Sequence, residues 1–152
     1  MSYHRLCGRN SLGAIMLALA MSLVTPAFSA TLPTDNEQEI LVKTTLMTFN
    51  DANLTGNYSV LFDKSSKAFR SQVTAEKLSE AFKVFRTKNV NLESIVADEI
   101  DSSKDPKIDG DGVLRLTGRF KDEDKKISFD LKFVHEDGVW KILGLNVKYK
   151  GE

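Results

Sequence analysis

The spacing of hydrophobic residues predicts a long helix at the start of the globular part of the chain. Apolar side chains recur at helical spacing from residue 40 to residue 54, on more than one stripe, as expected for a helix contacted on several sides. Thr34 and Glu37 form the capping-box pattern, in which the two residues exchange hydrogen bonds at a helix N-terminus. Gly56 suits the left-handed conformation that ends a helix. We therefore expect a helix from Thr34 to Gly56.

Two further helices are predicted before residue 89. Asn57 is suited to cap a short helix over residues 58–63. Thr74 is suited to cap a third helix, whose apolar residues fall at positions i, i+3, i+4 and i+7 and form one buried stripe. That stripe consists of Leu78, Ala81, Phe82 and Phe85.

After Asn89 the hydrophobic period becomes that of a β-strand. In residues 126–134 apolar side chains alternate with polar ones, so one side of the strand should be buried and the other exposed to solvent. The apolar row is Ile127, Phe129, Leu131 and Phe133. Residues 114–120 repeat this pattern, and residues 92–100 are a weaker strand candidate.

A hairpin and a bulge are predicted in the last strand. Asp137 and Gly138 supply the positive φ angles of a tight turn that leads into residues 139–149. The apolar positions in that strand change parity at Gly144, which indicates a β-bulge and hence a curved sheet. Three or four antiparallel strands after N-terminal helices define an α+β fold.

The first 29 residues have the three-part pattern of a secretory signal peptide. A basic start at Arg5 and Arg9 precedes an uncharged apolar run over residues 12–24, which is too short for a typical membrane span. Small residues then stand before a cleavage point at Ala30. We expect an exported protein, periplasmic or secreted, with a cleaved leader (1–29), one domain (30–152) and no stable membrane anchor.

The charge balance argues against a nucleic-acid partner. The 152 residues carry 21 basic and 21 acidic side chains, and removing Arg5 and Arg9 with the leader leaves 19 basic against 21 acidic. Binding to a phosphate backbone requires an excess of clustered Lys and Arg. Cys7, the single cysteine, precedes the apolar run and leaves with the leader, so neither a lipid anchor nor a disulfide is expected.

The order of predicted elements, with the stretches FNDANLTGNY (49–58) and LKFVHEDGVWKI (131–142), resembles the nuclear-transport-factor-two-like superfamily. In that family a strongly curved antiparallel sheet wraps the first helix and forms a cone. The resemblance implies a hollow between sheet and helices, which some members use as an enzyme pocket and many others use to bind a ligand or partner. Fold alone does not choose between these uses.

The best-defined inward row, from Ile127 to Phe133, contains no proton acceptor, so we expect a non-catalytic domain that binds a small apolar ligand or a partner's side chain. The residues assigned to this binding site are Phe49, Asp51, Tyr58, Phe129 and Trp140. No cofactor is expected.

Two alternative functions remain open at this point. One is a homodimeric interaction module of the cell envelope, in which the outward residues Ser128, Asp130 and Lys132 pair across a two-fold axis. The other is an isomerase or hydrolase that uses Asp51 with Tyr58, because the end of the first helix lines the cone mouth in the family that the chain resembles. A structural role for Asp51, as a cap or a local backbone acceptor, is the competing interpretation.

Metal binding is not expected. His135 is the single histidine after the leader and stands beside a turn, which favours a surface position. The run from Asp109 to Gly112 contains acidic residues, but Lys107 falls where a calcium loop needs another ligand. A glycine-rich turn into the following strand is the preferred interpretation.

Overall fold

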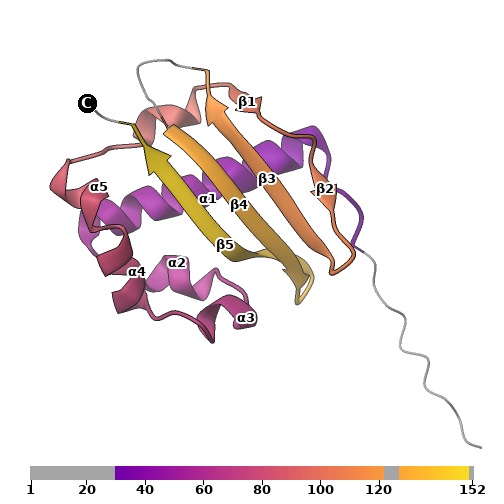
Figure 1. The fold of residues 1–152 in the computed structure, drawn as a ribbon, viewed down its shortest axis with the longest axis horizontal. Coiled ribbons are helices and arrows are strands. Elements are labelled where there is room, and N and C mark those ends of the chain that lie inside the picture. Colours follow the sequence, from indigo (N-terminus) through magenta and orange to yellow (C-terminus); the bar gives the residue numbers. More distant parts are fainter. Residues whose placement is uncertain (1–29, 122–126, 151–152) are drawn as a thin grey trace, which may run out of the picture.

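The computed structural model describes residues 30–121 and 127–150. In it, helix α1 (Asp35–Thr55) lies along one face of an antiparallel sheet (Figure 1). Its predicted start is confirmed. The Thr34 hydroxyl accepts a hydrogen bond from the Glu37 amide at 3.4 Å, and the Glu37 carboxylate accepts one from the Thr34 amide at 2.7 Å. The helix ends at Gly56, whose φ of 73° is the left-handed conformation expected there.

Four short helices follow α1: α2 (Ser59–Asp63), α3 (Lys67–Arg70), α4 (Ala75–Ala81) and α5 (Lys83–Thr87). The short helix after Asn57 is confirmed as α2, whereas α3 was not predicted. The prediction of one continuous helix after Thr74 is wrong, because the chain leaves helical geometry at Phe82. This break lets Phe82 and Phe85 both pack edge-to-face on Phe49, at 4.7 and 5.0 Å between ring centroids.

In the part of the chain that the structure describes, the sheet contains five strands: β1 (Ile100–Ser102), β2 (Lys107–Ile108), β3 (Val113–Phe120), β4 (Ile127–Glu136) and β5 (Val139–Tyr149). The strand order is β1-β3-β4-β5, β2 also pairs with β3, and every pairing between named strands is antiparallel. The strands predicted over residues 114–120, 126–134 and 139–149 are confirmed as β3, β4 and β5, except at residue 126, which lies outside the described residues.

The strand predicted over residues 92–100 is wrong for most of its length, because Glu93–Val96 forms a 3-10 helix, η1. Side-chain acceptors explain the turn. Asn50 Oδ1 accepts from the Leu92 amide at 2.8 Å, and Asn91 Oδ1 accepts from the Glu93 amide at 2.9 Å. These bonds offer the backbone an alternative to strand pairing. Only Ile100 of the predicted segment joins the sheet.

The β4–β5 hairpin has the predicted turn and bulge. Asp137 and Gly138 adopt φ angles of 55° and 82°. Lys132 pairs with Gly144 but Phe133 pairs with Ile142, so Leu143 is the extra residue of a β-bulge. The bulge places Ile142 and the later apolar residues Leu145 and Val147 on the same face of the sheet.

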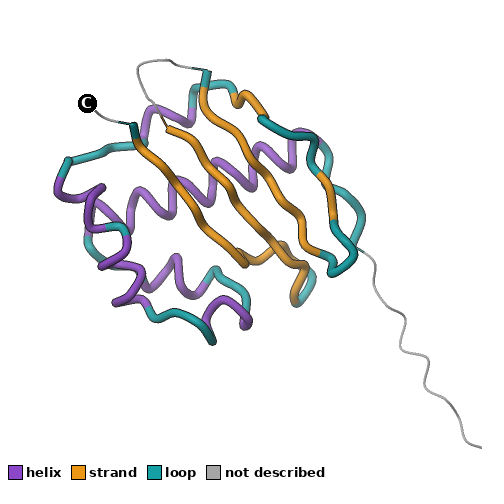
Figure 2. The backbone as a smooth tube through the Cα atoms, viewed as in Figure 1, coloured by secondary structure: helices purple, strands orange, loops and turns teal. Residues whose placement is uncertain are grey.

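The strong curvature implied by the family resemblance is not what the structure shows. Figure 2 shows β3, β4 and β5 side by side as a twisted layer in front of α1, and the sheet is not strongly curled. The edge strands β1 and β2 contain only 3 and 2 residues, so they are too short to carry the sheet around the helix. The bulge bends β5 locally and does not close the sheet.

The core lies between α1 and the inward rows of the strands. The predicted inward row of β4 is buried, with Leu131 and Phe133 only 0% and 1% exposed. On β3, Leu114 pairs with Phe133 and Leu116 pairs with Leu131, and both leucines are also buried. On α1, Leu46 and Phe49 are fully buried. Burial of each such side chain stabilises the fold by about 1.5–3 kcal/mol before entropy is counted.

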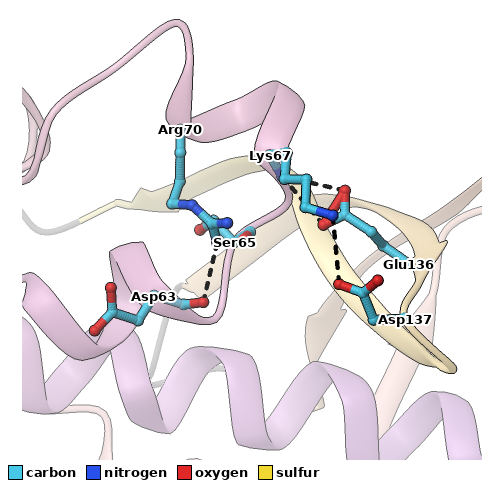
Figure 3. Close-up of polar contacts among 6 residues, drawn as sticks. All are labelled: Asp63, Ser65, Lys67, Arg70, Glu136 and Asp137. Carbon is cyan, nitrogen blue, oxygen red and sulfur yellow. Dashed lines mark hydrogen bonds and ion pairs between the residues drawn. The ribbon is translucent and has the colours of Figure 1, made fainter.

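The segment that carries α2 and α3 is attached to the turn end of the β4–β5 hairpin (Figure 3). The Glu136 carboxylate accepts from the Lys67 amide at 3.2 Å, and Lys67 Nζ lies 3.7 Å from Asp137 Oδ2. Arg70 Nη1 donates to the carbonyl oxygens of Asp63, at 3.2 Å, and Ser65. These contacts hold the short helices beside the sheet.

Candidate functional site

None of the clefts described here within residues 30–121 and 127–150 brings together the five residues predicted to bind a ligand. Phe49 and Tyr58 are 0% and 2% exposed and belong to the packed core near the C-terminal half of α1. Asp51 is exposed on α1. Phe129 and Trp140 line two separate clefts. In that core Phe82 and Phe85 pack edge-to-face on Phe49.

A cleft of about 540 Å³ lies between the N-terminal half of α1 and the strands β1, β3 and β4; we call it the α1 cleft. Its apolar lining comes from α1 and from three strands, and it consists of Val42, Ile100, Leu116 and Phe129. Its polar lining includes Asp35, Gln38, Glu39, Glu99, Ser102, Lys104 and Thr117. In Figure 1 the start of α1 approaches the side of the sheet that carries β1 and β2.

The apolar part of the α1 cleft follows from strand register. Leu116 and Phe129 are inward residues of β3 and β4, and Ile100 of β1 pairs with Phe120 on the same side. Phe129 stands opposite Gly118, which has no side chain to compete for that space. On the next pair along β1, Ser102 faces Gly118, so the edge of the sheet carries small residues where the cleft opens.

Carboxylates dominate the rim of the α1 cleft. Glu39 forms an ion pair with Lys43 at 2.6 Å. Glu99 pairs with Lys121, and this hydrogen-bonded ammonium lowers the pKa of the Glu99 carboxyl. Asp35 lies one helical turn before Glu39, while Lys104 is the single basic side chain in the described lining. A ligand with an apolar body and a positively charged or hydrogen-bond-donating end matches this distribution.

Tyr58 is part of a buried hydrogen-bonded group rather than a cleft. Its hydroxyl donates to Asn53 Oδ1, and Arg86 Nη1 donates to the same hydroxyl oxygen at 3.2 Å. Asn53 Nδ2 in turn donates to the Phe49 carbonyl at 2.9 Å. Burial raises the pKa of the Tyr58 phenol, partly offset by the charge of Arg86. The arrangement satisfies polar groups inside the core and ties α1 to α5.

Asp51 does not take part in this group. Its carboxylate is exposed and forms no hydrogen bond or ion pair with any described residue, and its backbone carbonyl accepts from the Thr55 hydroxyl at 2.7 Å. Neither the predicted cone-facing position nor a capping role for its side chain is seen. Asp51 and Tyr58 are therefore not brought together as an acid–base pair.

Trp140 and His135 line a second cleft of about 380 Å³ at the turn end of the hairpin, with residues 30–33 and the first turns of α1. The two rings pack edge-to-face at 5.3 Å between centroids and 80° between planes. His135 is exposed, in agreement with the surface position predicted for it. Leu41 and Ile40 of α1 complete the apolar side of this cleft.

Asp109 acts as a turn residue, as predicted. Its Oδ1 accepts from the amides of Asp111 and Val113 at 3.0 and 2.9 Å, which closes the turn into β3. Within residues 30–121 and 127–150, no group of three or more His, Cys, Asp or Glu residues is arranged to hold a metal ion. Across the same residues, no helix combines the length and apolar character needed to cross a membrane.

Most residues of the α1 cleft were not identified from the sequence. Val42 and Leu116 have the pattern of ordinary core residues, and nothing in their spacing distinguishes a cleft wall from a filled core. The i, i+4 pair of acids, Asp35 and Glu39, was a usable signal, because it places two carboxylates on one side of the first helical turns. The partner strand β1 was not predicted at its true position.

Comparisons of the chain with protein-family models, with curated proteins and with solved structures found no match.

Proposed function

We propose that the protein is a non-catalytic, exported binding domain that holds a small amphipathic molecule in the α1 cleft. The single observation that carries the proposal is the composition of that cleft, in which an apolar wall from four elements lies below a rim of carboxylates. A ligand would place its apolar body against Leu116 and Phe129 and its polar end near Glu39 and Glu99. The signal-peptide pattern of residues 1–29, which lie outside the described residues, supports export.

The proposal includes kinship with the nuclear-transport-factor-two-like superfamily. The order of elements, with a long capped helix against an antiparallel sheet, supports that kinship. The α1 cleft lies at the N-terminal half of α1, whereas the end of the first helix lines the cone mouth in that family, and the sheet is less curved than the resemblance implies.

A binding role is favoured over catalysis by the chemistry of the described lining. General acid–base catalysis needs a group whose pKa is tuned toward the working pH. In the α1 cleft, the pKa of Glu99 is lowered instead, which keeps it an ordinary carboxylate, and Glu39 is paired with Lys43. The lining contains no His, Cys or Tyr.

The experiment that tests the proposal is a thermal-shift screen of the purified protein against amphipathic amines, fatty acids and aromatic acids. Ligands that bind the folded state raise the melting temperature in proportion to their concentration and affinity. We expect cationic or hydrogen-bond-donating amphiphiles to stabilise the protein more than fatty acids of equal chain length. The absence of stabilisation by every class would contradict the proposal.

A further inference from the structure

The face of the sheet that points away from α1, which we call the outer face, carries an excess of basic side chains. The strand pairing and the alternation of buried and exposed residues show which side chains point outward. Six of these outward side chains are cations and three are carboxylates. The cations are Lys107, Arg115, Arg119, Lys132, Lys141 and Lys148, and the carboxylates are Asp101, Asp130 and Glu136. The whole chain has a formal net charge of zero, so its charges are segregated.

Each of the three carboxylates on the outer face already has a partner. Asp130 accepts two hydrogen bonds from the guanidinium of Arg115, and Asp101 accepts one from Arg119 at 2.9 Å. Glu136 accepts from the Lys67 amide at the hairpin end. The Arg115 hydrogen bonds lower the pKa of Asp130, with further contributions from Lys132 and Lys104.

The four lysines of the outer face are left without such partners. Lys107, Lys132, Lys141 and Lys148 form no ion pair with a described residue. Exposed ammonium groups that lie near one another attract anions and raise the rate at which anions associate with the protein. The outer face therefore has charge available for an anionic partner.

A cleft of about 320 Å³ crosses this face beside β3 and combines positive charge with hydroxyl and amide groups. Its basic lining is Lys104, Arg115, Arg119 and Lys148, its one carboxylate is Asp130, which is paired with Arg115, and its uncharged polar lining is Ser103, Thr117, Ser128 and Asn146. Ser103 Oγ and Thr117 Oγ1 are linked at 3.0 Å, so these hydroxyls are held in position. Hydroxyl and amide side chains match the hydroxyl groups of a sugar, and the basic side chains match an acidic substituent on it.

The cations extend beyond this cleft. Lys141 and Lys148 lie at opposite ends of β5, about 20 Å apart at the rise of an extended strand. Lys107, Arg115 and Lys132 form one row across three strands, because Arg115 pairs with both of the other two. A single small anion cannot contact all of these groups, whereas a polymer with repeated anionic groups can.

Other anionic partners fit the outer face less well. None of the outward side chains on the described strands is aromatic, so bases of a single-stranded nucleic acid would find no stacking platform. No Phe or Trp stands at these paired positions to enter a lipid bilayer, and the apolar residues there are Val113, Val134 and Val139. A second copy packed face to face would bring like charges together, which disfavours the homodimer predicted through this face.

We propose that the outer face binds a linear anionic polysaccharide, with one acidic sugar unit in the cleft beside β3 and neighbouring units along the lysines of β4 and β5. The charge excess, the ordered hydroxyl groups and the length of the basic surface carry this proposal. The cleft beside β3 shares Lys104, Thr117 and Phe129 with the α1 cleft, but its other lining residues differ and the proposal does not depend on a ligand in the α1 cleft.

The test measures binding of the purified protein to polygalacturonate and to dextran sulfate by isothermal titration calorimetry, with uncharged dextran for comparison. We expect binding to at least one of the two polyanions and none to dextran. Affinity should fall about tenfold or more between roughly 50 and 200 mM NaCl, because ionic contacts are weakened by salt. No binding to either polyanion at the lower salt concentration would overturn the proposal.

Variants locate the site. Lys132→Gln with Lys148→Gln should lower the affinity at least about fivefold, because it removes two ionic contacts. Lys77→Gln with Lys83→Gln removes the same charge from exposed helical positions and should leave the affinity unchanged. An equal loss in both double variants would overturn the assignment to the outer face. Equal or tighter binding of a DNA duplex, or of vesicles rich in anionic lipid, would overturn the assignment to a polysaccharide.

Discussion

Phe129 lies directly opposite Gly118 in the pairing of β3 with β4, and its ring occupies the space beside the glycine. A Cβ atom on Gly118 would lie 3.0 Å from Cζ of Phe129 and 2.7 Å from the carbonyl oxygen of Asp101. That oxygen belongs to the backbone of β1 and cannot rotate away as a side chain can. Because Phe129 also lines the α1 cleft, core packing and the candidate site depend on the same contact.

Gly118→Ala should destabilise the protein by about 1–3 kcal/mol, since the added methyl group must displace β1 or the Phe129 ring. The measurement is chemical denaturation followed by circular dichroism. Gly110→Ala is the matched control, because a Cβ there has nothing within 4 Å and its backbone is not left-handed. Equal stability of the two variants would show that β1 does not approach Gly118 as closely as described.

Phe133→Asp should prevent cooperative folding. The side chain is 1% exposed, and the substitution places a charge without a partner among apolar residues. Lys132→Asp, one position earlier on the exposed side of β4, should retain a folded circular dichroism spectrum. A sharp thermal transition in the Phe133 variant would contradict the assignment of the buried row of β4.

Tyr58→Phe should cost about 1–3 kcal/mol, because it removes the donor to the buried Asn53 Oδ1 and leaves that oxygen unsatisfied. Tyr149→Phe, at a ring 39% exposed, is the control and should change stability much less. Denaturation of both variants at neutral pH makes the comparison.

The raised pKa of Tyr58 also predicts how stability changes in alkali. The unfolded phenol ionises near its ordinary pKa of 10.0, whereas the folded one remains neutral to higher pH. Tyr58 therefore stabilises the fold fully below pH 10.0, and this contribution is lost as pH rises toward its folded pKa. We expect wild-type stability to fall more steeply above that pH than the stability of Tyr58→Phe. Parallel curves would contradict the burial of the phenol.

Ser102→Trp and Ser103→Trp should separate the two proposed sites. The two serines are exposed neighbours at the end of β1, but Ser102 lines the α1 cleft and Ser103 lines the outer-face cleft. An indole at 102 should abolish stabilisation by amphipathic ligands and leave polyanion binding intact, and an indole at 103 should do the reverse. Thermal shift and calorimetry on the same two proteins make the comparison. Loss of both activities in one variant would show that the two sites are not independent.

Local signals predicted much of the framework correctly. The Thr34–Glu37 capping box, the alternation through Phe129 and Phe133, the Asp137-Gly138 turn and the bulge beside Gly144 all act through residues close in sequence. Their geometry follows from hydrogen bonds and backbone angles that a short segment can satisfy alone. For this reason α1, β3, β4 and β5 could be predicted with their faces.

Contacts between distant segments decided what local patterns could not. Asn50 on α1 accepts from the Leu92 amide, 42 residues away, and this bond helps to turn a predicted strand into a 3-10 helix. Phe49 packs edge-to-face with Phe82 and Phe85, at the place where the predicted third helix is broken. No periodicity in the sequence contains such information, because it arises only when separate elements pack.

The sequence by itself determined the α+β class, the start of α1 and the inward side of the main strands, because caps, turns and alternation are local. Tertiary structure alone decided that the cleft lies beside Val42 and Leu116 rather than beside Phe49 and Tyr58. It also collected basic residues from β2, β3, β4 and β5 on one face of a chain whose total charge is zero. The physical reason is that a cleft or a charged surface depends on which elements pack together and which face each leaves to solvent.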